Sequence, residues 1–69
     1  MRTETTIYSD DEKKPIATID GALMPPVGSK ILLDSRRSYV VSEPPEIHIN
    51  RPDDRLGDEV IIYITVVEG

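Results

Sequence analysis

His48 is the only histidine in the chain, which has no cysteine. Because imidazole titrates near neutral pH, His48 is the first candidate for a general base. In a strand over 46–50, alternation places Glu46 and Asn50 on the same face as His48, so a carboxylate and imidazole pair is geometrically possible. No nucleophile accompanies that pair. We therefore expect an exposed strand histidine with a cross-strand contact, and we predict no catalytic residue.

A second candidate site is a group of four carboxylates: Asp53, Asp54, Asp58 and Glu59. Carboxylate oxygens are ligands that calcium and magnesium prefer. However, the alternating ligands and central glycine of a calcium loop are missing, and two arginines lie among the acids, which favours surface ion pairs. One histidine and no cysteine also leave no zinc ligand set. We predict no metal and no cofactor, and we predict that the four acids, together with Tyr63, contact a partner.

Hydroxyl side chains are plentiful, but none lies in a motif that would activate it. The glycine-serine-glycine elbow of hydrolases is absent, and so are the GxxxxGK and GxGxxG loops that hold phosphate groups. The interior of a small barrel is just wide enough for its own side chains. We therefore expect a protein that is not an enzyme.

The elements that must position these residues follow from the composition. The chain has 69 residues, of which 38% are apolar, and β-branched Ile (9) and Val (6) outnumber Leu (4) and Ala (2). Branching at Cβ is disfavoured in helices and suits a pleated sheet. Six prolines and four glycines between the aliphatic runs supply turns. This composition predicts a single all-β domain over residues 1–69.

The alternation of apolar residues predicts five or six antiparallel strands, at 3–6, 15–20, 30–34, 39–43, 46–50 and 59–67, curled into a small barrel or sandwich. Closing the sheet would remove its unpaired edges. The strand over 46–50 is expected to bury one face. The last strand is apolar on both faces, so it lies between two layers or contacts another subunit. The expected core comprises Ile7, Ile16, Ile31, Leu33, Val41, Ile47, Ile49, Val60, Ile62 and Ile64.

One segment carries a resemblance to a known group of proteins. MPPVGSKILLD, followed by SYVV, has a proline, an apolar residue and a glycine before a strand, then a polar turn and Tyr-x-Val. Over roughly residues 24–42 the chain resembles small, mostly uncharacterised bacterial and phage β-barrel proteins that are SH3-like in shape. Where those proteins often have an acid after the glycine, this chain has Ser29. The resemblance implies a compact antiparallel barrel that acts by binding, and it transfers no functional residue.

The charge balance limits the classes of partner that this chain is expected to bind. The net charge is −5, the pI is about 4.6, and no window is predominantly basic, which argues against nucleic-acid binding. The first residues lack the apolar core of a signal peptide, and no run reaches the 18 apolar residues of a membrane span. We expect a cytoplasmic protein without membrane contacts.

Two functions from different classes remain open, together with a special case of the first of them. The first is a non-catalytic protein-binding module, accessory or inhibitory, that occludes a partner whose basic patch meets the acids of this chain. The second is a self-associating structural subunit, a homo-oligomer that pairs through the 60–67 strand. The special case is an acidic DNA mimic that blocks a DNA-binding enzyme.

Overall fold

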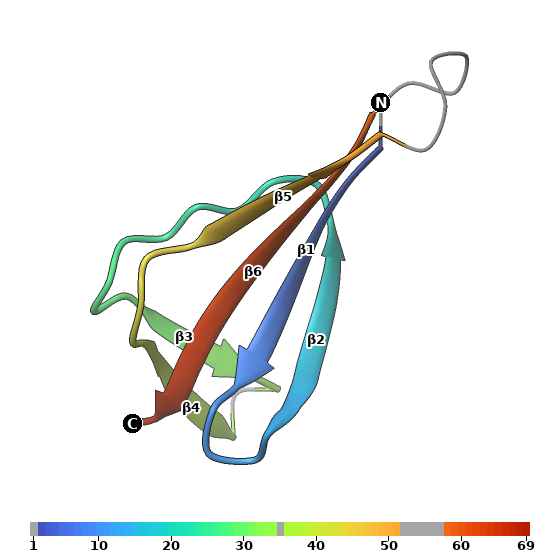
Figure 1. Cartoon of the computed structure of the whole chain (residues 1–69). Coiled ribbons are helices and arrows are strands. Elements are labelled where there is room, and N and C mark those ends of the chain that lie inside the picture. The colour runs from blue at the N-terminus through green and yellow to red at the C-terminus, as the bar shows by residue number, and fades with distance from the viewer. Residues whose placement is uncertain (1, 35, 52–57) are drawn as a thin grey trace.

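The computed structural model describes residues 2–34, 36–51 and 58–69, which form six strands and no helix (Figure 1). The all-β prediction is therefore confirmed, and the six predicted strands all occur within a few residues of their expected positions. None of the described residues lies in a helix long and apolar enough to cross a membrane. The strands are β1 Arg2–Ser9, β2 Lys14–Asp20, β3 Lys30–Leu33, β4 Arg37–Val41, β5 Glu46–Asn50 and β6 Glu59–Glu68.

All six strands belong to one mixed sheet with β6 at its centre. The order is β2-β1-β6-β4-β3, and β5 also pairs with β6. The expectation of a wholly antiparallel sheet is wrong in one place, because β1 and β6 run parallel over their full paired length from Arg2 opposite Glu59 to Ser9 opposite Val66. Parallel neighbours need a long crossover connection, and here the other four strands provide it.

Strands β4 and β5 occupy the same side of β6, one after the other. Val41 of β4 lies opposite Val66, and Glu46 of β5 lies opposite Tyr63. The chain therefore advances five residues from Val41 to Glu46 while β6 advances only three. The two extra residues form a bulge that contains Pro44 and Pro45, where the missing N–H groups interrupt the ladder. The hairpin partner β3 runs beside β4 alone.

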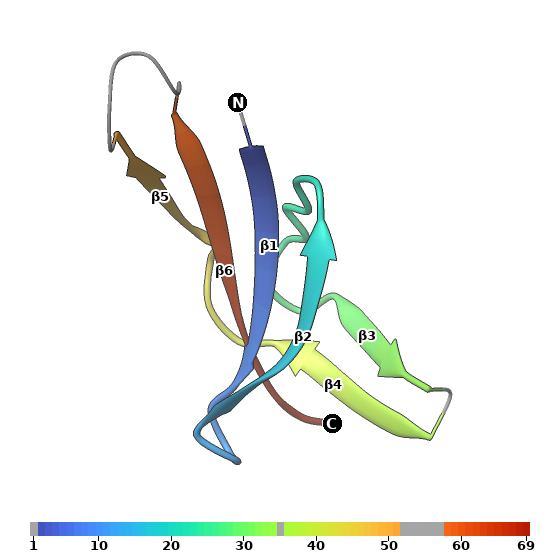
Figure 2. The same cartoon turned by 90° about the vertical axis from the view of Figure 1, so that its right-hand side faces the viewer.

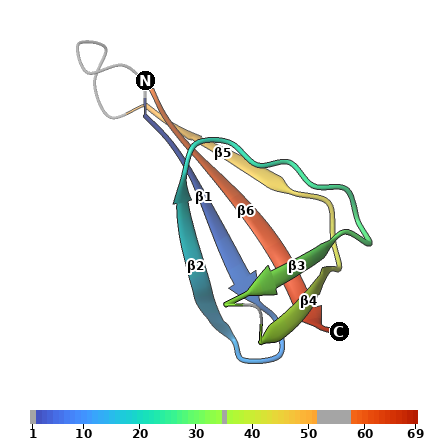
Figure 3. The ribbon, with the colours of Figure 1, turned by 180° about the vertical axis from the view of Figure 1, so that it is seen from behind.

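The sheet curls into a half-barrel that stays open between its end strands. β2 pairs with β1 and β3 pairs with β4, and among the described residues neither makes a strand pair across the opening. In Figure 2 the β3 and β4 hairpin projects to one side of the sheet, and in Figure 3 the 21–29 segment passes in front of that concave side. The expected closure is therefore incomplete.

The concave face carries the core. From β6 it receives Ile62, Ile64 and Val66, which lie opposite Thr5, Ile7 and Ser9 of the parallel neighbour. Of the core predicted from sequence, Ile7, Val41, Ile62 and Ile64 are buried, whereas Ile16, Ile31, Leu33 and Val60 are half-buried against them. Tyr39 and Val66 complete the buried apolar cluster and were not predicted.

The prediction of a buried face on β5 is wrong. Ile47 and Ile49 do point to the concave side, because they lie opposite Ile62 and Val60, but they are 51% and 59% exposed. All five residues of β5 are exposed. The reason is topological: β3 extends the sheet beside β4 and ends there, so no described strand lies beyond β5 to cover its isoleucines.

Candidate functional site

An apolar groove lies in the concave side of the half-barrel, at the opening between β2 and β3. Its volume is about 330 Å³, which is in the range of binding pockets for drug-sized ligands. The floor consists of buried core residues, and one wall is the 21–29 segment. The side chains that line the groove are all apolar: Ile7, Ile19, Leu23, Met24, Pro25, Ile31 and Ile64.

The wall of the groove is held in place by one buried hydroxyl. The Thr5 side chain is completely buried, and its Oγ1 donates to the Gly21 carbonyl at 2.7 Å and accepts from the Leu23 N–H at 3.1 Å. Gly21 has a positive φ of 103°, a conformation that glycine adopts without a steric penalty, and it turns the chain out of β2. The sequence thus positions Leu23 and Met24 through a contact with a strand 18 residues earlier.

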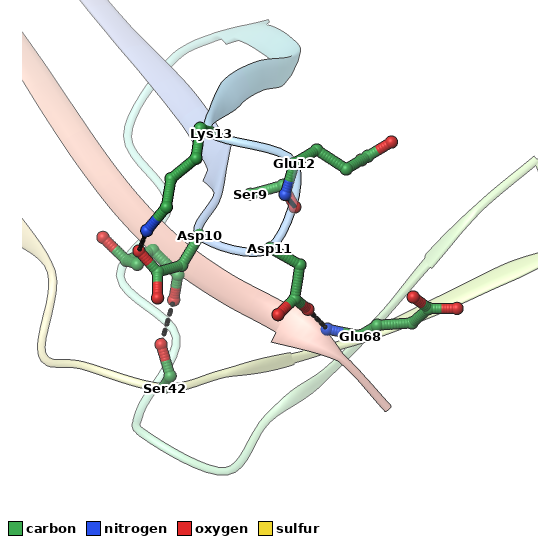
Figure 4. A network of polar contacts seen from close by, with 8 residues as sticks. Ser9, Asp10, Asp11, Glu12, Lys13, Ser42 and Glu68 are labelled. Atoms are coloured by element: carbon green, nitrogen blue, oxygen red, sulfur yellow. Dashed lines mark hydrogen bonds and ion pairs between the residues drawn. The ribbon is translucent and has the colours of Figure 1, made fainter.

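A polar pocket lies at the opposite end of the sheet, where the loop between β1 and β2 meets the last residues of β6 (Figure 4). The Ser9 hydroxyl accepts from the Glu12 N–H at 3.1 Å, and the Asp11 carboxylate accepts from the Glu68 N–H at 2.6 Å. Lys13 pairs with Asp10 at 3.0 Å, and the hydrogen bond to that carboxylate raises the pKa of Lys13. Residues 10–14 of this hairpin loop are exposed, whereas Ser9 is buried.

Arg37 and Tyr39 close the polar pocket from β4. The Tyr39 hydroxyl donates to Glu12 Oε2 at 3.3 Å, and the guanidinium of Arg37 lies 3.7 Å from Glu12 Oε1. A hydrogen bond with Tyr39, reinforced by the charge of Glu12, raises the pKa of Arg37. The donors and acceptors of this pocket are mainly satisfied by one another, and its charges are exposed. Such pairs contribute little to stability.

His48 lies on the convex face of the sheet, away from the groove. Its Nε2 is 2.8 Å from Glu46 Oε1, and its ring packs edge-on against Tyr63 with 4.8 Å between centroids. The expected exposed histidine with a cross-strand contact is confirmed. Among the described residues, no group of three histidine or acidic side chains is arranged to hold a metal ion.

Of the residues predicted to contact a partner, those that the structure describes do not come together in one site. Asp53 and Asp54 lie outside the described residues. Asp58 precedes β6 and pairs with Arg51 at 3.5 Å. Glu59 and Tyr63 share the convex face of β6, about 13 Å apart along a strand that rises about 3.3 Å per residue.

The groove was not predicted, although one signal for it is visible in the sequence. Leu23, Met24 and Val27 are large apolar residues in a segment whose prolines and glycines prevent a helix or a strand. Apolar residues in such a segment must pack on another element or remain exposed. In the structure they are 43%, 53% and 54% exposed, at the rim of the half-barrel.

Comparison of the chain with protein-family models, curated protein sequences and solved structures finds no match. The candidate site therefore rests on the geometry of the chain itself.

Proposed function

We propose that this protein is a non-catalytic protein-binding module whose groove receives an extended apolar segment of a partner protein. The observation that carries the proposal is the groove itself, which is lined entirely by apolar side chains and lies open between the ends of the sheet. An exposed apolar concavity is typical of an interaction site.

An extended peptide suits this groove better than a compact ligand does. The outer edges of β2 and β3 flank the opening, and β2, beyond the Lys14 and Pro15 that protect its start, offers backbone N–H and C=O groups to an added strand. Apolar side chains of the peptide would alternate into the groove, while its backbone pairs with an edge. A small apolar molecule would use the side chains and leave the edges unused.

The acidic surface supports a partner with basic residues near its apolar segment. The chain carries a net charge of −5, so complementary charges on the partner would mainly accelerate association. An accessory or inhibitory protein that occludes a partner surface works through such contacts, and the resemblance to small SH3-like barrels implies a protein that acts by binding. The DNA-mimic alternative makes a different prediction, namely competition with duplex DNA.

The test begins with a random peptide library displayed on phage and selected against the immobilised protein. A selected peptide is then synthesised and titrated against wild type and the double variant Leu23→Asp, Met24→Asp. We expect the peptide to be apolar and alternating, and its affinity to fall at least about tenfold in the double variant, because two apolar contacts are replaced by charges.

The matched control is Leu32→Asp. Leu32 is 64% exposed on the convex side of β3, outside the groove, so an apolar-to-aspartate change there should leave the affinity within about twofold. An equal loss in the control and the double variant would contradict the proposal. A groove that binds an apolar dye but selects no peptide would show a small-molecule pocket instead.

A further inference from the structure

Within the described ranges three strands have a free edge, and these edges are protected to different degrees. Exposed edges invite pairing with another chain, and proteins protect them with lysine, proline or short strands. β2 begins with Lys14 and Pro15, and β3 has only four residues and begins with Lys30. β5 contains neither lysine nor proline, and its five residues are all exposed.

The free edge of β5 presents the backbone groups of its two isoleucines. The Ser42 N–H donates to the Thr65 carbonyl, so Thr65 directs its backbone groups toward β4 and β5. By alternation along β6, Tyr63, Ile61 and Glu59 direct their backbone groups to the same side. Their partners on β5 are Glu46, His48 and Asn50. Ile47 and Ile49 therefore direct their N–H and C=O groups away from β6, where no described residue pairs with them.

The sequence of β5 is complementary to itself. If two copies pair antiparallel about a two-fold axis at His48, Ile47 lies opposite Ile49 of the second copy, and Glu46 lies opposite Asn50. Apolar residues then face apolar residues on the concave side, and no acid faces an acid in a chain of net charge −5. Both outward-facing residues of each strand find backbone partners in this register.

We propose that a second copy of this chain pairs with the free edge of β5 and forms a two-fold dimer with one continuous sheet. The isoleucines exposed at 51% and 59% become a four-residue apolar ladder beside Ile62 and Val60. This surface differs from the convex face of β6 that the sequence indicated for self-association, and from the groove of the proposed function. The two proposals can therefore fail separately.

The first test is sedimentation equilibrium of the purified chain over a range of concentrations. We expect the average mass to rise from that of one chain to that of two chains as the protein concentration increases. Added salt should shift this rise to lower protein concentration, because it screens the repulsion between two negatively charged copies. Ile49→Pro removes an outward N–H that β6 does not use, so the variant should stay folded and monomeric. A wild-type chain that remains monomeric up to millimolar concentration overturns the proposal.

The matched control is Thr18→Pro on β2. The Gly21 N–H donates to the Thr3 carbonyl, so by alternation Thr18 also directs its N–H to a free edge. This variant should dimerise like wild type. If Ile49→Pro fails to fold, Ile47→Lys places a charge on the exposed ladder and should likewise prevent dimers. Dimers that persist in the folded variant overturn the proposal.

The second test determines the register in which the two β5 strands pair. Because the chain has no cysteine, a disulfide between protein sulfurs in a single-cysteine variant must link two chains; it forms when the thiolate of a second chain displaces glutathione from a mixed disulfide. In the proposed register residue 48 lies opposite itself in a pair without backbone hydrogen bonds, where Cα atoms are about 4.5 Å apart, within the range of a disulfide. With oxidised glutathione as oxidant, His48→Cys should form linked dimers at least about tenfold faster than Thr18→Cys. Equal rates overturn the proposed pairing.

Discussion

Ile62→Asp is expected to abolish folding. Ile62 is 3% exposed at the centre of β6, between β1 and β5, and belongs to the buried cluster. The change removes a core side chain, which costs about 2 to 5 kcal/mol, and buries a carboxylate without a partner, which costs several more. A chain of 69 residues has a total stability of roughly 3 to 10 kcal/mol. Far-ultraviolet circular dichroism should therefore show an unfolded variant.

The matched control is Ile47→Asp. Ile47 is the same residue type, lies directly opposite Ile62 and points to the same side of the sheet, but it is 51% exposed. This variant should keep its sheet spectrum and lose about 1 kcal/mol of unfolding free energy or less in urea titration, measured at a concentration where dimers dissociate. A folded Ile62→Asp variant would contradict the strand assignment, and an unfolded Ile47→Asp variant would contradict the exposed position of β5.

The strands were predictable because their signal is local. β-branched runs bounded by prolines, glycines and polar turns mark where strands begin and end, and alternation correctly placed Ile62 and Ile64 on the buried face of β6. The parallel pairing of β1 and β6 was not predictable in this way. This pairing brings together two strands that are far apart in sequence, and the local sequence pattern of a strand does not indicate which other strand lies beside it.

The error on β5 has the same cause. Ile47 and Ile49 alternate with polar residues as they would in a half-buried strand, and they do point to the concave side. Whether they are buried depends on what lies across from them, and that is decided by β3 extending beside β4 and not beside β5. Alternation identifies which residues share a face, whereas topology decides whether that face is covered.

The groove was missed because its wall depends on a contact distant in sequence. Threonine is typical of an exposed strand position, yet Thr5 is fully buried and holds the 21–29 segment through its hydroxyl. The apolar residues of that segment could be recognised as lacking a regular element, but their packing partner could not. The candidate site is therefore a property of the fold, and the two chosen acids that the structure describes, Asp58 and Glu59, lie elsewhere.

Thr5→Val is the direct test of this dependence. Valine has nearly the shape of threonine but can neither donate to the Gly21 carbonyl nor accept from the Leu23 N–H. Leaving these two groups without their partner should lower the unfolding free energy by about 1 to 3 kcal/mol, since water replaces part of the interaction at an exposed segment. The sheet should remain folded, whereas hydrogen exchange at the Leu23 amide should become at least about tenfold faster.

The control for this effect is Thr3→Val, two residues earlier on the same face of β1. The Thr3 side chain is half-buried and makes no hydrogen bond to the described residues. Its replacement should change the unfolding free energy by no more than about 0.5 kcal/mol, and it should leave hydrogen exchange at the Leu23 amide unchanged. Peptide binding to the groove should weaken in Thr5→Val and persist in Thr3→Val, because only the first change releases the wall. Unchanged exchange at Leu23 in Thr5→Val would show that the hydroxyl does not hold the segment, and that the groove is shaped by apolar packing alone.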